Sequence, residues 1–123
     1  MTKRILVIED QEDNRKIVRD LLSSAGYEVI EATTGVEGVA AAKVETPDLI
    51  LMDIQLPGIN GYEATRQIRA NPALQHIPII AVTSYALGGE ERKAIEAGCD
   101  AYFAKPFSPR KLLGKIREYV PQE

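Results

Sequence analysis

The stretch Asp48-Leu49-Ile50-Leu51-Met52-Asp53-Ile54 decides the fold. Its centre is apolar without interruption, which is typical of a strand that is buried on both faces of a parallel sheet. Two further apolar runs, residues 5–8 and 77–82, lie before and after it in the chain. Together the three runs predict a parallel sheet whose central strands are covered on both sides.

Helical patterns separate these runs from one another and from two weaker strand patterns. We expect strands at 5–8, 28–32, 48–54, 77–82 and 101–104. We expect helices at 13–25, after the capping box Thr34-Gly35-Val36-Glu37, after the N-cap Asn60, at 89–97, and from Ser108-Pro109 to Pro121. This alternation predicts an α/β fold, a flavodoxin-like (βα)5 doubly wound parallel five-stranded sheet with strand order 2-1-3-4-5. Residues 1–123 are expected to form a single domain without an output domain.

Helical periodicity also predicts which side chains of the helices face the sheet. In the first helix the expected inward stripe includes Ile17 and Leu22, and in the last helix it includes Tyr119. In the second helix the residues expected to face inward are Val36, Val39, Ala40 and Val44.

Composition and charge exclude several classes of function. The 123 residues carry a net charge of -3, which disfavours nucleic-acid binding because that needs clustered positive charge. A single cysteine, Cys99, cannot form an internal disulfide, which favours a reducing cytoplasm. Neither a signal peptide nor an apolar run of membrane-spanning length is found, so we expect no membrane partner.

Acidic residues follow two strands that are neighbours in the expected sheet. Glu9 and Asp10 end the first strand, and Asp53 ends the third. Ligands of open α/β sheets bind beyond the carboxyl ends of the strands where the strand order reverses, which here falls between these two strands. Three converging carboxylates repel one another unless a cation neutralises them, and Mg²⁺ prefers such oxygen ligands. A single acid after a strand is more often a helix cap or a solvated loop residue.

Three further polar side chains are expected at the same edge of the sheet. Thr83 and Ser84 end the fourth strand, and Lys105 ends the fifth. Pro106 allows a cis peptide bond that directs the lysine inward. A carboxylate nucleophile, a metal site, a hydroxyl and an ammonium together are the groups that phosphoryl transfer requires.

Five segments, in this order and spacing, resemble the receiver domain of response regulators of two-component systems over essentially the whole chain. The similarity is greatest to stand-alone regulators of the cell-division and chemotaxis type. The segments are Ile5-Leu6-Val7-Ile8-Glu9-Asp10, Leu51-Met52-Asp53-Ile54-Gln55-Leu56-Pro57-Gly58-Ile59-Asn60-Gly61, Ala81-Val82-Thr83-Ser84, Ala97-Gly98-Cys99-Asp100-Ala101-Tyr102 and Lys105-Pro106-Phe107.

The resemblance implies that Asp53 attacks the phosphohistidine of a sensor kinase and becomes an acyl phosphate. It implies that Asp10 ligates Mg²⁺ directly, and that the backbone carbonyl of Gln55 completes the protein ligands. Glu9 stands where an aspartate is commoner, so its carboxylate holds the metal either through water or directly. Receiver domains of this kind are signalling proteins and not classical enzymes.

The resemblance also implies roles for the residues around the phosphoryl group. Thr83 donates to one phosphoryl oxygen and Lys105 pairs with another. Tyr102 is the aromatic residue that turns inward when Thr83 moves. Tyr85 is bulky for its position, and we expect it to shield the acyl phosphate from water.

Two surfaces are expected to meet partners. The face formed by the fourth helix, the fifth strand and the fifth helix binds a downstream protein or a second copy of the chain. The first helix, with Asn14, Arg15, Val18 and Leu22, docks a sensor histidine kinase or phosphotransfer protein, or else is an ordinary half-buried helix. Output regulation and a phosphorelay shuttle or phosphate sink fit the sequence equally.

Three other functions fit the sequence less well. A flavin carrier needs a phosphate-binding loop after the first strand, whereas residues 9–13 are acidic there. An aspartyl-phosphate phosphatase usually has a second acid two residues after the nucleophile, where this chain has Gln55. A pure interaction module has no need to keep Asp10, Asp53, Thr83 and Lys105 together.

Overall fold

The computed structural model describes residues 2–84 and 89–121, in which parallel strands alternate with helices. The strands are β1 (Arg4–Ile8), β2 (Glu28–Ala32), β3 (Leu49–Asp53), β4 (Ile79–Thr83) and β5 (Ala101–Ala104). The helices are α1 (Glu12–Ser24), α2 (Gly35–Glu45), α3 (Gly61–Arg69), α4 (Glu90–Ala97) and α5 (Pro109–Tyr119). A short 3-10 helix, η1 (Pro72–Leu74), was not predicted.

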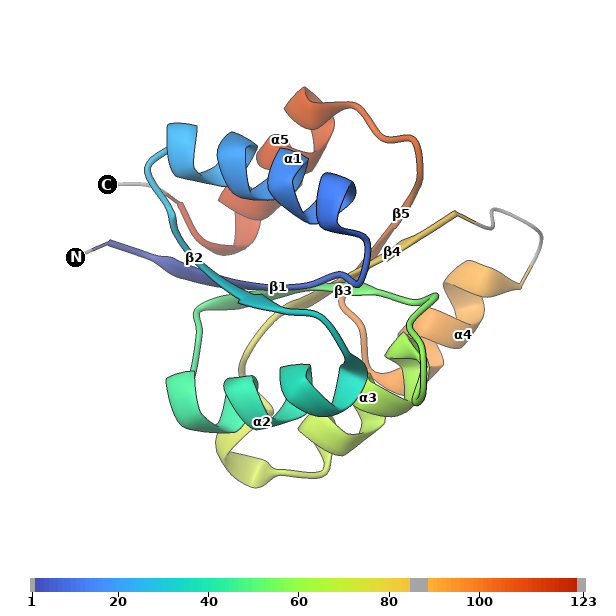
Figure 1. Cartoon of the computed structure of the whole chain (residues 1–123). Helices are drawn as coiled ribbons and strands as arrows, with labels where there is room; N and C mark the ends of the chain where they lie inside the picture. The colour runs from blue at the N-terminus through green and yellow to red at the C-terminus, as the bar shows by residue number, and fades with distance from the viewer. Residues whose placement is uncertain (1, 85–88, 122–123) are drawn as a thin grey trace.

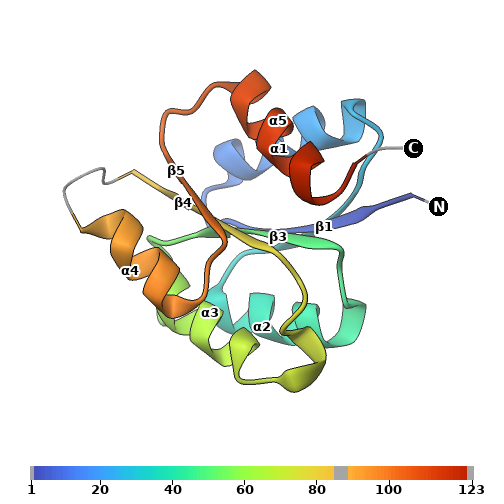
Figure 2. The same ribbon diagram turned by 180° about the vertical axis from the view of Figure 1, so that it is seen from behind.

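The five strands form one parallel sheet in the order β2-β1-β3-β4-β5, which confirms the predicted fold. Helices α1 and α5 cover one face of the sheet, and α2, α3 and α4 cover the other (Figures 1 and 2). Because every strand is parallel, all five carboxyl ends lie at the same edge. The register there pairs Ile8 with Met52 and Asp53 with Val82.

Alternate residues of the central strands supply two apolar cores. Leu6 and Ile50 belong to the core under α2, α3 and α4, whereas Ile5 and Leu49 belong to the core under α1 and α5. Each side chain of this size contributes about 1.5–3 kcal/mol when it is fully buried. The continuous apolar runs of the sequence are therefore explained by burial on both faces.

Side-chain caps begin three of the helices where the sequence predicted them. The Thr34 hydroxyl accepts a hydrogen bond from the Glu37 amide at 3.0 Å, and the Asn60 side chain accepts one from the Glu63 amide at 3.0 Å. The Ser108 hydroxyl accepts one from the Lys111 amide at 3.4 Å. These contacts satisfy backbone donors that a helix start leaves unpaired.

The predicted inward face of α2 is wrong. Val39 packs against the core, but the other three residues are exposed: Val36, Ala40 and Val44. The inward residues include Gly38 and Ala42, because α2 lies so close to β1 that a Cβ at Gly38 would fall 2.4 Å from the Ile8 Cδ1. Only small residues fit between the helix and the strand.

Two other residues expected in the core lie at the surface. The Ile17 side chain on α1 is 62% exposed, and Tyr119 on α5 is 37% exposed. The Tyr119 hydroxyl donates to the Asp100 carbonyl at 3.3 Å, so this ring covers the loop before β5 instead of the sheet. Among residues 2–84 and 89–121, no helix has the length and apolarity needed to cross a bilayer.

Candidate functional site

Three carboxylates meet at the carboxyl edge of the sheet, as the sequence predicted. Glu9 and Asp10 follow β1 directly, and Asp53 is the last residue of β3. One carboxylate oxygen from each lies within 4.8 Å of the other two. Glu9 and Asp53 are 4% and 5% exposed, whereas Asp10 is half-buried. Adjacent strands and a shared edge therefore place three negative groups in a space that one cation can neutralise.

Lys105 reaches this cluster from the end of β5. Its Nζ lies 2.6 Å from the Glu9 Oε1 and 3.7 Å from the Asp53 Oδ1. The peptide bond between Lys105 and Pro106 is cis, as the sequence suggested. One ammonium thus lies between two buried carboxylates, but it is much closer to Glu9.

Because Lys105 pairs mainly with Glu9, the pKa values of the Glu9 and Asp53 carboxyls are shifted in opposite directions. Burial, together with the neighbouring Glu9 carboxylate, raises the pKa of Asp53 to about 7. Burial is the largest single influence on Glu9 and acts in the same direction, but the hydrogen bonds from Lys105, the Gln11 amide and Asp53, together with the charge of Lys105, outweigh it and leave the pKa of Glu9 below its ordinary value. In the absence of a metal, the proton that the cluster retains therefore resides on Asp53.

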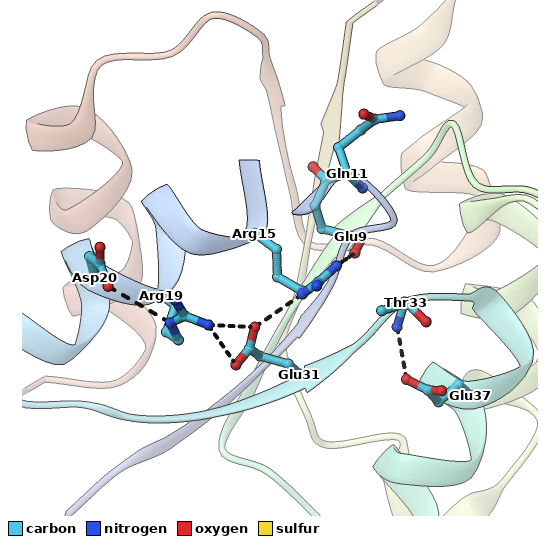
Figure 3. A network of polar contacts seen from close by, with 8 residues as sticks. All are labelled: Glu9, Gln11, Arg15, Arg19, Asp20, Glu31, Thr33 and Glu37. Carbon is cyan, nitrogen blue, oxygen red and sulfur yellow. Dashed lines mark hydrogen bonds and ion pairs between the residues drawn. The ribbon is translucent and has the colours of Figure 1, made fainter. Parts of the chain in front are cut away.

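The acidic loop after β1 is held in place by Arg15 (Figure 3). The Arg15 Nη1 donates to the Glu9 backbone carbonyl at 3.0 Å, and its Nε donates to the Glu31 Oε1 at 3.1 Å. The Gln11 amide donates to the Glu9 Oε2 at 3.1 Å. The sequence did not reveal this support, because Glu31 lies sixteen residues beyond Arg15.

Thr83, fully buried at the end of β4, is bound by the side chain of Gln55. The Gln55 Nε2 donates to the Thr83 Oγ1, and the Ser84 amide donates to the Gln55 Oε1 at 2.9 Å. The Gln55 amide donates to the Asp53 Oδ1 at 3.2 Å. The sequence assigned Gln55 a role only through its backbone carbonyl, which stays a prediction, and missed its side chain.

Gly61 lets the loop after Asp53 fold back closely on its own strand. A Cβ at Gly61 would lie 2.5 Å from the Asp53 carbonyl oxygen and 2.7 Å from the Ile54 Cα. The Gly61 amide donates to the Ile54 carbonyl at 2.9 Å. This approach starts α3 immediately beside the residue that carries the central carboxylate.

Of the two tyrosines expected to take part in switching, the structure describes Tyr102 but not Tyr85. Tyr102 pairs in register with Ala81 in β4 and packs against the core under α2, α3 and α4. Its movement with Thr83 stays a prediction. Tyr85 lies outside the described residues.

An apolar pocket of about 70 Å³ borders the carboxylate cluster on the face covered by α1 and α5. Ile17 and Val18 of α1 line it, together with Phe107 and Leu112. Asp53 and Lys105 line the same pocket. A protein that approaches Asp53 over α1 therefore meets an apolar surface next to the charged groups.

The donor set of the site suits a hard divalent cation. Carboxylate oxygens are the ligands that Mg²⁺ prefers, and the three found here converge without help from His or Cys. When ionised, a carboxylate such as that of Asp53 can act as a nucleophile, and the ammonium 3.7 Å away can stabilise negative charge that develops there. The arrangement can therefore support acceptance of a phosphoryl group.

Comparisons with known proteins agree with this geometry. The family model described as the response regulator receiver domain matches residues 5–117. The chain is 43% identical over 120 residues to the polar-differentiation response regulator DivK of Brucella ovis, covering 98% of each chain. It is also 36% identical, with a TM-score of 0.91, to the receiver domain of a sensor histidine kinase from Pseudomonas aeruginosa PAO1, covering 99% of this chain and 100% of that one.

That Pseudomonas structure was solved with a magnesium ion coordinated in its active-site cleft. A CheY-like receiver domain protein from Methanospirillum hungatei is 37% identical, with a TM-score of 0.87, over 96% of this chain and 93% of that one. The residues that the family model matches include Glu9, Asp10 and Asp53. The chain belongs to the response regulator receiver domain family, the signalling domains of two-component systems.

Proposed function

We propose that this protein accepts a phosphoryl group on Asp53 from the phosphohistidine of a sensor kinase or a phosphotransfer protein. The observation that carries the proposal is the convergence of Glu9, Asp10 and Asp53 within 4.8 Å beside Lys105. Three acids and one ammonium leave the cluster with excess negative charge, which a divalent cation would neutralise. Membership of the receiver family and the magnesium ion in the Pseudomonas relative support this reading.

Mg²⁺ would be held by Asp10 and Asp53, with the Gln55 backbone carbonyl as a further ligand. Both oxygens of Glu9 already have protein partners, Lys105 and the Gln11 amide. We therefore favour contact between Glu9 and the metal through water over direct ligation. When bound, the cation neutralises the carboxylates and the charge that develops on the phosphoryl group.

The chemical step belongs to Asp53. One oxygen of its ionised carboxylate forms the new O–P bond, the P–N bond of the phosphohistidine breaks, and the imidazole leaves with that electron pair. Thr83 and Lys105 donate to the phosphoryl oxygens. Because Lys105 is paired with Glu9 before the reaction, its ammonium must move toward the phosphoryl group as the new negative charge arrives.

The phosphodonor docks over α1. Asn14, Ile17 and Val18 line the apolar pocket that reaches Asp53, so a partner helix placed there brings its histidine to the acceptor. Leu22 was expected both on the inward stripe of this helix and on the docking surface; it is fully buried in the core, so it takes no part in docking. Ile17, expected in the core, replaces it as the exposed apolar contact.

The signal leaves through the face formed by α4, β5 and α5. Thr83 lies at the end of β4 and Tyr102 lies in the neighbouring strand β5, so a change at Asp53 reaches this face across two strand pairs, from β3 to β4 and from β4 to β5. The partner on this face is a downstream protein or a second copy of the chain. Chemical-shift mapping with beryllofluoride tests this; unchanged α4 and β5 resonances would contradict it.

The central test is incubation with acetyl phosphate and Mg²⁺, followed by intact mass measurement. We expect an adduct of one phosphoryl group, absent in Asp53→Asn and retained in Asp20→Asn, whose acid is exposed on α1. If neither acetyl phosphate nor any phosphorylated kinase gives an adduct, the proposal is wrong. A phosphorelay shuttle would pass the label from Asp53 to a histidine protein, whereas an output regulator or a phosphate sink would not.

A further inference from the structure

We propose that the Gln55 side chain is a latch on the phosphoryl-binding edge. It holds Thr83 and Ser84 as they lie in the unphosphorylated protein, and it must release them before they can contact a phosphoryl group on Asp53. Gln55 thus acts through Thr83 and Ser84 as a positioning residue. The inference rests on the proposed function, and it concerns a side chain for which only a backbone role was expected.

Gln55 contacts both sides of the site. Its backbone amide donates to the Asp53 Oδ1 at 3.2 Å, so the residue is anchored to the acceptor. Its carboxamide then spans to β4, where Nε2 donates to the Thr83 Oγ1 and Oε1 accepts from the Ser84 amide at 2.9 Å. One side chain thus closes a ring with a hydroxyl and the next backbone amide.

The Thr83 hydroxyl and the Ser84 amide, which Gln55 holds, are also groups that we expect to bind a phosphoryl group on Asp53. Asp53 pairs in register with Val82, so Thr83 and Ser84 follow directly beyond the acceptor. The Ser84 amide has a single hydrogen, which is engaged by the Gln55 Oε1. A phosphoryl oxygen on Asp53 therefore competes with Gln55 for that donor and for the orientation of the Thr83 hydroxyl.

We expect the phosphoryl group to displace the Gln55 side chain in this competition. Phosphorylation brings about -1.5 to -2 charges and three acceptor oxygens to Asp53. Hydrogen bonds to a charged acceptor are stronger than those to a neutral carboxamide, so the phosphoryl group takes the Ser84 amide from the Gln55 Oε1. In the unphosphorylated protein the two neutral bonds to Gln55 favour the resting arrangement, which lowers the population able to bind a phosphoryl group.

Glutamine suits the latch because one end donates while the other accepts. Methionine has a similar length but offers no comparable donor or acceptor. Gln67 on α3 provides a matched control, because its side chain is exposed and its Nε2 donates to the Glu63 Oε2 of the same helix at 3.2 Å. Gln55→Met and Gln67→Met therefore differ in whether the bonds to Thr83 and Ser84 are lost.

The test combines amide NMR with titration of beryllofluoride, a phosphoryl mimic, in the presence of Mg²⁺. In Gln55→Met we expect the Ser84 amide resonance of the free protein to move toward its position in the beryllofluoride-bound parent. We expect the apparent affinity for beryllofluoride to rise about 5-fold, as the loss of one or two modest hydrogen bonds allows. Gln67→Met should match the parent in both measurements.

A Ser84 resonance and a beryllofluoride affinity in Gln55→Met equal to those of Gln67→Met would overturn the latch. A weaker affinity would overturn it too, because Gln55 would then support the phosphorylated state. Gln55→Leu repeats the measurement with a second apolar side chain if the methionine variant does not fold. If the parent itself fails to bind beryllofluoride, the proposed function fails, which is a different result from a parent that binds and variants that do not differ.

Discussion

The Lys105 Nζ lies 2.6 Å from the Glu9 Oε1 but 3.7 Å from the Asp53 Oδ1. The ammonium that a phosphoryl acceptor would use is therefore paired mainly with a different carboxylate. Asp53 is left buried beside a negative neighbour, and its pKa is raised to about 7 for that reason. This relationship explains why the acceptor carboxylate would need a divalent cation before it can act as a nucleophile at neutral pH.

The raised pKa of Asp53 predicts how stability depends on pH. Without Mg²⁺, folded Asp53 keeps its proton up to about pH 7, whereas the unfolded chain releases it near its ordinary value of 3.8. The folded state thus binds more protons, so the free energy of unfolding should fall by roughly 2 kcal/mol between about pH 5 and pH 8. Urea unfolding measures this, and Asp53→Asn should flatten the profile. Equal slopes in the two proteins would contradict the prediction.

Replacing Lys105 should destabilise the protein at neutral pH and above. Lys105→Met leaves the buried carboxylates of Glu9 and Asp53 without their cation, which we expect to cost about 2–4 kcal/mol in metal-free buffer. Added Mg²⁺ should recover part of the loss. The control is Lys115→Met, whose ammonium pairs with Glu118 at 3.3 Å on the surface and should change stability by less than about 0.5 kcal/mol. Denaturant midpoints that coincide for the two variants would show that the pairing with Glu9 adds nothing.

A charged residue at position 17 should slow phosphotransfer from a kinase without changing phosphorylation by a small-molecule donor. Ile17→Lys puts an ammonium at the mouth of the apolar pocket, so phosphotransfer from a histidine kinase should slow about 10-fold or more, as loss of a central apolar contact does at interfaces. Labelling of Asp53 by acetyl phosphate should be unchanged, because it needs no docking. Val44→Lys is the control, since Val44 is 77% exposed on α2 on the opposite face of the sheet (Figure 1). If Ile17→Lys and Val44→Lys accept phosphate from the kinase equally fast, α1 is not the docking surface.

Two glycine replacements should have opposite effects on stability. Gly61→Ala puts a Cβ 2.5 Å from the Asp53 carbonyl oxygen, so the loop must shift, and we expect a loss of about 2–4 kcal/mol. Gly114→Ala lies in α5, where a Cβ would meet nothing within 4 Å, and should stabilise the protein by about 0.5–1 kcal/mol. Thermal unfolding of both variants measures the difference. A stable Gly61→Ala protein that still accepts phosphate normally would refute the close approach.

Arg69 should be far more important to stability than its neighbour Arg66. The Arg69 guanidinium donates to the carbonyls of Gly98 at 2.9 Å and Ile77 at 2.7 Å, and to the Asp100 Oδ2 at 2.9 Å. Arg69→Met removes these three hydrogen bonds around the start of β4 and should cost about 3 kcal/mol. Arg66→Met removes an exposed side chain and should cost less than about 0.5 kcal/mol. Chemical denaturation decides between this ranking and equal effects.

Much of the fold was predictable because its signals are local. The apolar runs of β1, β3 and β4 reflect burial on both faces, and the caps Thr34, Asn60 and Ser108 act within three residues of themselves. The convergence of Glu9, Asp10 and Asp53 was also predictable, because parallel strands end at one edge and the strand order places β1 beside β3.

The errors arose where contacts between elements decide the outcome. Helical periodicity assumes that the larger apolar side chains face the core, yet α2 turns Gly38 toward Ile8 and leaves Val36 and Val44 in solvent. The distance between a helix and a strand decides which residues fit, and that distance is set by the packing of both. The same reasoning misplaced Ile17, which is exposed and lines the apolar pocket instead of the core.

The sequence by itself determined the order of strands and helices and the acids that lie at the strand ends, because both follow from residue type and spacing. Only the tertiary structure decided which side chains pair there. The Lys105 ammonium pairs with Glu9, 96 positions away, and the Gln55 side chain donates to Thr83, 28 positions away. Such pairs depend on the register of several strands and on the reach of individual side chains. The spacing of residues along the chain determines neither of these.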